Sequence, residues 1–158
     1  MVKQRMVVKA DGLAEDVVPS LDCANVNVDH TGGCLCGAIN YSASNLRPLW
    51  YCHCDQCRKM TGHHMAAVQV AYYNITVRGE PKWYYVSDAS AHGFCGDCGC
   101  QLFWRNDNND YLSVTAGSLN DTSGLILKGH VFTSEKGGYY NIPKTDLQYS
   151  EFWDEDPS

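Results

Sequence analysis

Short runs of apolar, aromatic and β-branched residues alternate with turn-forming residues along most of this chain. Such runs favour extended strands, whereas the Gly, Asn and Asp residues between them favour turns. Closely spaced short strands are typical of an all-β, β-rich fold built from short antiparallel sheets. The pattern predicts strands at residues 38–41, 67–72, 82–86, 101–104, 111–114 and 130–132.

One segment is predicted to be helical. Residues Asp55 to Thr61 (DQCRKMT) are long enough for about two turns, and the next residue, Gly62, is of the type that commonly ends a helix. No longer helical pattern is evident. The fold should therefore contain at most one or two short helical turns.

The two ends of the chain differ from its middle. Residues 1–30 show weak periodicity and a Pro19-Ser20 break, which predicts an N-terminal extension. We expect the main domain at residues 31–153 and a short acidic tail at 154–158. The full length of 158 residues suits one domain with an ordinary core.

Composition limits the partners of the protein. The formal net charge is -6 and no cluster of Lys and Arg occurs, so neither nucleic acid nor an anionic membrane is an expected partner. The longest apolar runs, such as residues 65–68, are far shorter than the ~20 residues that cross a bilayer. The first residues also lack the apolar core of a signal peptide. We expect a cytoplasmic protein that acts on a small molecule, with an oligomeric state that the sequence does not indicate.

Cysteine is the residue type that carries the chemistry. Nine cysteines are too many for chance in a reducing compartment and too few for a disulfide-stapled small protein of this length. Metal binding accounts for them better, and Cys23, in the extension, is expected to be a free thiol. The other cysteines form three clusters: Cys34-Leu35-Cys36, Cys52-His53-Cys54-Asp55-Gln56-Cys57 and Cys95-Gly96-Asp97-Cys98-Gly99-Cys100.

The first and third clusters together predict a structural zinc site. Residues i and i+2 of a strand point to the same face, so a C-x-C pair can present two thiolates to one ion. A C-x-x-C turn does the same, and four thiolates complete a structural site. The predicted ligands are Cys34, Cys36, Cys95 and Cys98. Cys100 forms a second C-x-C pair with Cys98 and is an alternative ligand, although turn geometry favours Cys95 and Cys98.

The middle cluster predicts a second zinc ion. Cys52, Cys54 and Cys57 supply three thiolates, and a zinc with three protein ligands keeps a position for water or substrate, as catalytic sites do. The alternative is a second structural site closed by His53, His63 or His64. His53 fits that alternative poorly, because it faces away from the metal if Cys52 and Cys54 face it along a strand.

The order of these clusters matches a known family. The chain resembles the glutathione-dependent formaldehyde-activating enzyme family, also called the centromere-protein-V/formaldehyde-activating domain. The resemblance extends from residue 32 to about residue 153. The matching segments are GGCLCGAINY (32–41), YCHCDQCRKMTG (51–62), FCGDCGCQLF (94–103), SVTAGSLND (113–121) and HVFTSEKGGYYNI (130–142).

The resemblance implies a β-tent fold with two zinc ions and an activity. The implied structural ligands are Cys34, Cys36, Cys95 and Cys98, and the implied catalytic ligands are Cys52, Cys54 and Cys57. The implied reaction is the reversible condensation of glutathione, as co-substrate, with formaldehyde to S-hydroxymethylglutathione. The expected activity is that of a carbon-sulfur lyase resembling S-(hydroxymethyl)glutathione synthase.

Several residues are candidates for supporting roles. His63, His64, Arg58 and Lys59 are candidates for proton transfer or for binding the carboxylates of glutathione. The matched segment at Thr115, Ala116 and Gly117 is a weaker candidate for the pocket wall.

The sequence also departs from the family pattern. The His-His-Met run after Gly62 stands where relatives usually carry small or apolar residues, and Cys100 stands where they usually carry a small polar residue. Two alternatives therefore stay open: the same scaffold acting on a different reactive carbonyl or glutathione adduct, and a non-catalytic zinc module that binds a protein.

Overall fold

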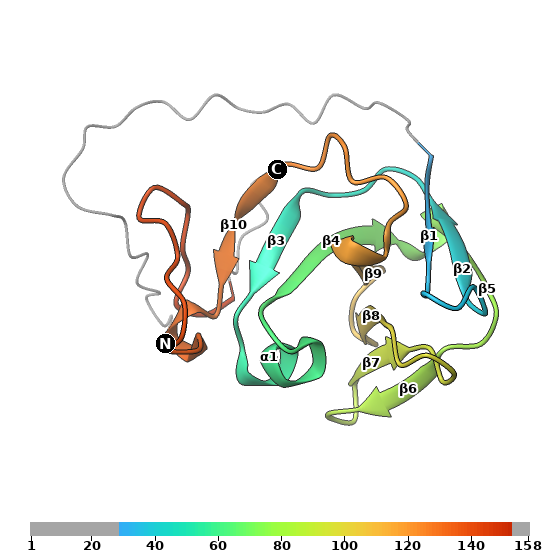
Figure 1. Ribbon diagram of the computed structural model, residues 1–158, viewed down its shortest axis with the longest axis horizontal. Coiled ribbons are helices and arrows are strands. Elements are labelled where there is room, and N and C mark those ends of the chain that lie inside the picture. The colour runs from blue at the N-terminus through green and yellow to red at the C-terminus, as the bar shows by residue number, and fades with distance from the viewer. Residues whose placement is uncertain (1–28, 153–158) are drawn as a thin grey trace. The chain divides into compact units, whose positions relative to one another are not determined.

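A computed structural model describes residues 29–152 of the chain (Figure 1). The tail predicted at 154–158, the thiol of Cys23 and all but the last two residues of the predicted N-terminal extension lie outside the described residues. The predicted domain boundaries therefore stay predictions. Within the described residues the chain divides into two compact units, the first formed by residues 50–65 and 128–152 and the second by 29–49 and 66–127.

The second unit contains a three-stranded antiparallel sheet in the order β1-β2-β5. Burial alternates along β2, where Tyr41 and Ala43 are buried and the residues between and before them are exposed. This period of two is the pattern of a strand with one face on the core. The strands are β1 (His30–Gly33), β2 (Asn40–Ala43) and β5 (Ile75–Arg78).

Five further strands of the second unit pair in the order β4-β9-β8-β7-β6, each antiparallel to its neighbour. Their inward side chains form a core that includes Val68, Phe103 and Val114, all fully buried. The register between β7 and β8 shifts at Gly93 and Phe94, directly before Cys95. The strands are β4 (Met65–Ala71), β6 (Lys82–Tyr85), β7 (Ser90–Phe94), β8 (Gln101–Asn106) and β9 (Tyr111–Thr115).

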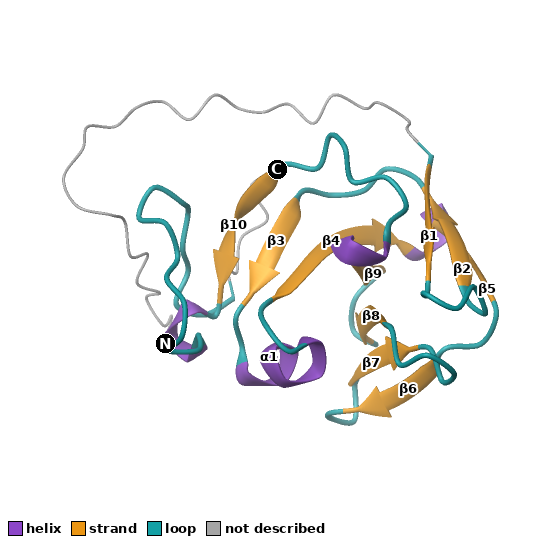
Figure 2. Cartoon of the chain, in the orientation of Figure 1, coloured by secondary structure: helices purple, strands orange, loops and turns teal. Residues whose placement is uncertain are grey.

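In the first unit, β3 (Leu49–Cys52) lies beside β10 (Leu127–Val131) and leads into the helix α1 (Asp55–Thr61), shown in Figure 2. Gly62 ends α1 in the left-handed conformation at φ 81° and donates its N–H to the carbonyl of Arg58 at 2.9 Å. Short 3₁₀ helices occur at Tyr72–Asn74, Ala116–Ser118 and Thr133–Glu135.

The predicted fold class is confirmed: the protein is β-rich, its sheets contain antiparallel strands, and α1 has the predicted bounds. No helix among the described residues is long and apolar enough to cross a membrane. The strand predicted at 38–41 begins two residues late, at Asn40. Phe132 was wrongly placed in a strand, because its backbone adopts a φ of 56° and opens a 3₁₀ helix.

Four strands were missed by the sequence prediction. β1 carries two glycines and β7 carries one, and glycine has a low preference for strands. β3 and β5 are short and lie next to turn residues. In β1 and β7 the pairing partners, rather than their own residues, hold the backbone extended.

Close packing at Gly32 fixes the strand that leads into the first cysteine pair. A Cβ atom at Gly32 would lie 2.3 Å from the Tyr41 hydroxyl oxygen and 2.5 Å from the Ser118 carbonyl oxygen. The Tyr41 hydroxyl is itself buried and bonded to the Ser118 hydroxyl at 2.7 Å. Only a residue without a side chain fits between these groups.

We therefore expect Gly32→Ala to lower the free energy of unfolding by about 1–3 kcal/mol, the usual cost of overpacking. The matched control is Gly117→Ala, because nothing lies within 4 Å of a Cβ at that position. Its effect should stay within about 0.5 kcal/mol. Urea unfolding of both variants in the same metal-loaded state measures the difference, and equal midpoints would contradict this packing.

Candidate metal centres

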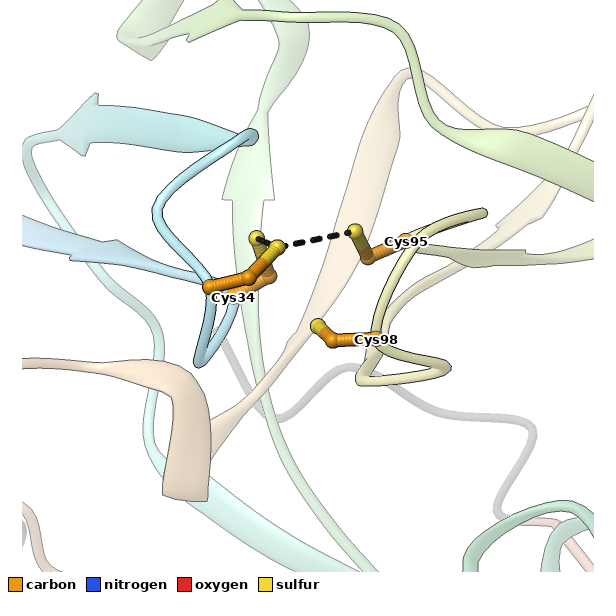
Figure 3. Close-up of side chains that lie close together, drawn as sticks. Cys34, Cys95 and Cys98 are labelled. Atoms are coloured by element: carbon orange, nitrogen blue, oxygen red, sulfur yellow. Dashed lines mark hydrogen bonds between the residues drawn. The ribbon is translucent and has the colours of Figure 1, made fainter.

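Four cysteines of the second unit come together from two distant parts of the chain. The sulfur atoms of Cys34, Cys36, Cys95 and Cys98 all lie within 4.8 Å of one another. Cys34 and Cys36 follow β1, whereas Cys95 and Cys98 lie between β7 and β8. Figure 3 shows the side chains of Cys34, Cys95 and Cys98 pointing toward one another. The Cys36 sulfur lies 3.5 Å from that of Cys34 and 3.7 Å from that of Cys95.

Both cysteine pairs lie on tight hydrogen-bonded turns. Gly37 donates its N–H to the Cys34 carbonyl at 3.1 Å, and Gly99 donates to the Cys95 carbonyl at 2.9 Å. Both glycines have positive φ, 80° and 72°, a conformation that a side chain disfavours. The backbone N–H of Ile39 also donates to the Cys34 sulfur at 3.2 Å. The turns, rather than a regular strand, aim the four thiols at one point.

The thiols of this cluster affect each other's ionisation. Backbone hydrogen bonds, first from Cys36 and then from Cys100, lower the pKa of Cys98 to about 6. A backbone hydrogen bond from Ala38 lowers the pKa of Cys36, but its bonds to Cys34 and Cys98 outweigh this and raise that pKa to about 12. Closely spaced thiolates repel, and a divalent cation among them removes that repulsion. The four thiols therefore fit a metal ion of the kind that sulfur ligands favour.

Cys100 does not belong to the four-cysteine cluster. Its sulfur lies 3.9 Å from the Gln101 carbonyl oxygen. The structure thus groups Cys95 and Cys98 with the first pair, as the turn geometry led us to expect.

A second cluster lies in the first unit, where the sulfur atoms of Cys52, Cys54 and Cys57 are within 4.8 Å of one another. Cys52 ends β3, Cys54 caps the start of α1, and Cys57 is in its first turn. The Cys57 backbone N–H donates to the Cys54 sulfur at 3.3 Å, so the helix start holds this sulfur in place. Cys57 is buried and the other two are half-buried.

Only one thiol of this second cluster ionises readily in the absence of a cation. Hydrogen bonds, first from Cys52 and then from Cys57, lower the pKa of Cys54 to about 2. The hydrogen bond between Cys52 and Cys54 raises the pKa of Cys52 to about 12. Hydrogen bonds to Cys52 and then to Cys54 raise the pKa of Cys57. Three thiolates at this spacing need a shared positive charge, so this cluster also fits a metal ion.

No histidine or carboxylate of the described residues joins the three-cysteine cluster. Both ring nitrogens of His53 are engaged elsewhere, Nδ1 with the Tyr140 hydroxyl at 2.5 Å and Nε2 with His130 at 2.8 Å. Nδ1 of His63 bonds to the Tyr139 hydroxyl at 3.0 Å. Three protein donors are fewer than the four that close a structural zinc site.

His53 and His64 are packed side chains rather than surface ones. His53 is fully buried, and the ring of His64 stacks on that of Tyr51 at a centroid distance of 4.4 Å. Burial first, and neighbouring histidines second, lower the pKa of each to about 4. Both imidazoles are therefore neutral at physiological pH, and Nδ1 of His64 is buried with no partner in the described part of the chain.

The remaining candidates have partners within their own unit. Asp55 pairs with both Arg58 and Lys59 along α1, the latter at 2.8 Å. Thr115 is buried, and its hydroxyl donates to the Gln101 carbonyl at 2.9 Å, which ties the end of β9 to β8. Ala116 and Gly117 are the first two residues of the 3₁₀ helix Ala116–Ser118.

Three residues beside the second cluster were missed by sequence reasoning. His130, Tyr140 and Asp146 connect to His53, directly or through one another, by side-chain hydrogen bonds. His130 and Tyr140 lie 77 and 87 positions from His53, so no local spacing indicates them. The only sign in the sequence is that His130 and Tyr140 both lie inside the segment 130–142 already matched by resemblance.

Two comparisons relate this chain to known proteins. The family model described as glutathione-dependent formaldehyde-activating enzyme matches residues 29–135, well over half of the chain. The chain is also similar to a crystal structure of a protein from Rhodobacter sphaeroides, with a TM-score of 0.51 and 22% sequence identity. That similarity covers 61% of this chain and 97% of the other, and at this identity it supports the fold alone.

Metal analysis of three serine variants tests the two clusters. The wild-type protein should bind about two metal equivalents per chain, one per cluster. Cys54→Ser should stay folded and retain one, whereas Cys34→Ser should lose solubility and both, because its cluster joins distant segments of the second unit. Cys100→Ser is the matched control and should retain two. Equal unfolding of Cys34→Ser and Cys54→Ser would contradict the division into a structural and an open site.

Proposed function

We propose a function for this chain from the premise that it belongs to the glutathione-dependent formaldehyde-activating enzyme family. The protein is a zinc-dependent carbon-sulfur lyase that forms and cleaves the adduct of a thiol with a small carbonyl compound. Glutathione is the proposed thiol and formaldehyde the proposed carbonyl, giving S-hydroxymethylglutathione. The observation that carries this proposal is the three-cysteine cluster that no other donor of the described residues completes.

Zinc is the proposed ion at both clusters, because thiolate-only donor sets favour it over harder cations. Cys34, Cys36, Cys95 and Cys98 would hold the structural ion. Cys52, Cys54 and Cys57 would hold the catalytic ion, which supplies affinity for a substrate sulfur as thiolate at neutral pH.

The surroundings of the three-cysteine cluster suit a charged thiol substrate. Arg58 and Lys59 place two positive charges on α1, next to Cys57 in sequence, and Asp55 neutralises only one of them. Nε of Arg58 is buried and has no hydrogen-bond partner among the described residues. These cations are the proposed partners of the substrate carboxylates, an interaction that fixes orientation as well as charge.

A specific observation favours a second candidate, the same chemistry on a larger carbonyl compound or another glutathione adduct. The ring of His63 contacts those of Tyr139 and Tyr140, at centroid distances of 5.5 and 4.5 Å, and Tyr139 is 63% exposed. Flat aromatic surfaces of this kind bind larger or unsaturated groups better than they bind formaldehyde.

The cellular setting is part of the same proposal. With a net charge of -6 and no basic cluster, the protein is proposed to act in the cytoplasm on small molecules, without a nucleic-acid or membrane partner. A non-catalytic zinc module that binds a protein is the competing reading, and it predicts no turnover of any adduct.

Exchange spectroscopy with ¹³C-labelled formaldehyde and glutathione tests the activity. The zinc-loaded protein should speed exchange between free and glutathione-bound carbon above the spontaneous rate. Cys54→Ser should lose this acceleration, whereas Cys100→Ser should keep it, because only the first removes a donor of the three-cysteine cluster.

A folded protein with both metals that accelerates neither formaldehyde nor larger aldehydes would contradict the proposed function. Acceleration with a larger aldehyde alone would select the second candidate.

A further inference from the structure

A continuous chain of side-chain hydrogen bonds runs through the first unit. The Asp146 carboxylate lies 3.1 Å from Nε2 of His130. Nδ1 of His130 lies 2.8 Å from Nε2 of His53, and Nδ1 of His53 lies 2.5 Å from the Tyr140 hydroxyl. Four side chains from distant parts of the sequence thus share three bonds in a row. We call this set the Tyr140–Asp146 chain.

Hydrogen bonds to the backbone of His53, His130 and Tyr140 hold three members of this chain in place. His53 donates its N–H to the Val131 carbonyl at 3.0 Å, which fixes it beside β10. His130 donates its N–H to the Leu147 carbonyl at 2.8 Å and accepts from Tyr149 at 2.9 Å. The Tyr140 carbonyl accepts from Nζ of Lys136 at 2.9 Å. Such preorganised bonds keep the order of the chain.

The donors and acceptors of the chain can be followed from its carboxylate end. When the Asp146 carboxylate accepts and each ring holds one proton, His130 donates from Nε2 and leaves Nδ1 as an acceptor. His53 must then donate from Nε2 and accept at Nδ1, and the Tyr140 hydroxyl must donate to it. The lone pairs of the Tyr140 oxygen are therefore free to accept a proton from a further group.

The Tyr140 hydroxyl lies at the end of the chain nearest the three-cysteine cluster in sequence, because it bonds to His53, the residue between Cys52 and Cys54. Burial is the largest effect on the pKa of Tyr140 and raises it, and Tyr139 and Cys52 raise it further. A backbone hydrogen bond from Gly137 and the charge of Arg58 lower this pKa by less. Tyr140 is therefore a neutral phenol at physiological pH. At the other end, the Asp146 side chain is 27% exposed and can exchange protons with solvent.

We propose that the Tyr140–Asp146 chain carries protons between the oxygen of the bound adduct and solvent, with Tyr140 as the group that meets the substrate. This inference rests on the proposed lyase function. It adds Tyr140 as the residue that exchanges a proton with the substrate, and His53, His130 and Asp146 as the groups that pass the proton on to solvent.

The proton and electron balance of the step is complete. In cleavage, the adduct hydroxyl gives its proton to Tyr140, while the Tyr140 proton moves to His53, the His53 proton to His130 and the His130 proton to Asp146. Each imidazole gains a proton on one nitrogen and loses one from the other, so neither changes its charge. The electrons of the O–H bond form the carbonyl double bond, and those of the C–S bond leave with sulfur. Condensation is the reverse.

The first test needs no substrate. Two-bond ¹H–¹⁵N spectra of zinc-loaded protein with labelled histidine should show His53 and His130 both protonated at Nε2 only. Asp146→Asn replaces the obligate acceptor by an amide that can also donate, so the Nε2-protonated population of both rings should fall. Nδ1 protonation in the wild type, or spectra unchanged in Asp146→Asn, would overturn the inference.

The second test compares two Tyr→Phe variants by the exchange rate of the adduct. Tyr140→Phe should slow it by about 100-fold or more, the usual contribution of a general acid or base. Tyr73→Phe is the matched control, because its ring is 86% exposed in the second unit and belongs to neither the chain nor the proposed substrate surface, and it should leave the rate unchanged. Metal content of both variants shows whether the fold is retained.

The outcomes separate the two proposals. If the wild-type protein accelerates exchange and Tyr140→Phe is as fast as Tyr73→Phe, the proton chain alone is contradicted. Wild-type protein that accelerates no exchange contradicts the lyase function and, with it, the role of Tyr140. A Tyr140→Phe variant that loses its metals leaves the histidine spectra of the wild type and Asp146→Asn to decide.

Discussion

Thiols that lie within 4.8 Å of one another cannot all ionise unless a cation lies among them. Two cysteine clusters of this protein have sulfur atoms at this spacing. In the three-cysteine cluster, hydrogen bonds first from Cys52 and then from Cys57 lower the pKa of Cys54, while the pKa of Cys52 is raised. The rest of the architecture serves to bring these groups together. In the second unit, glycine turns after β1 and β7 aim two pairs at one point. In the first unit, the end of β3 and the start of α1 bring together the sulfur atoms of Cys52, Cys54 and Cys57.

The three-cysteine cluster and the Tyr140–Asp146 chain are joined by the alternation of residues 52 to 54. Cys52 and Cys54 belong to the cluster, whereas His53, between them, is buried and bonds to His130 and Tyr140. Residues 52 to 54 thus supply two thiols of the cluster and one member of the chain. A metal site and a proton path can thus share a backbone without sharing a side chain.

The sequence was informative where spacing alone decides the outcome. The helix at Asp55–Thr61 and the choice of Cys95 and Cys98 over Cys100 rested on local turn chemistry, and the structure has the helix and leaves Cys100 out of the four-cysteine cluster. The prediction that His53 faces away from the cysteines rested on strand periodicity and agrees with its contacts. Ligation by these cysteines and the identity of the metal stay predictions.

What the sequence could not indicate depends on long-range pairing. β1 and β7 contain glycines that argue against strands, and only their neighbours keep them extended. Asp146 reaches His130 because the backbone of residues 147–149 bonds to His130 on both sides. Contacts of this kind leave no spacing that a reader of the sequence could recognise.

X-ray absorption at the zinc edge, recorded with and without glutathione, tests the central claim most directly. The account predicts one ion with four sulfur neighbours and one with three, and a gain of one sulfur at the second ion when glutathione binds. A Cys54→Ser sample should show only the first ion and no response to the thiol. A second ion already closed by a protein donor, or sulfur counts that glutathione leaves unchanged, would contradict an open thiol-binding site.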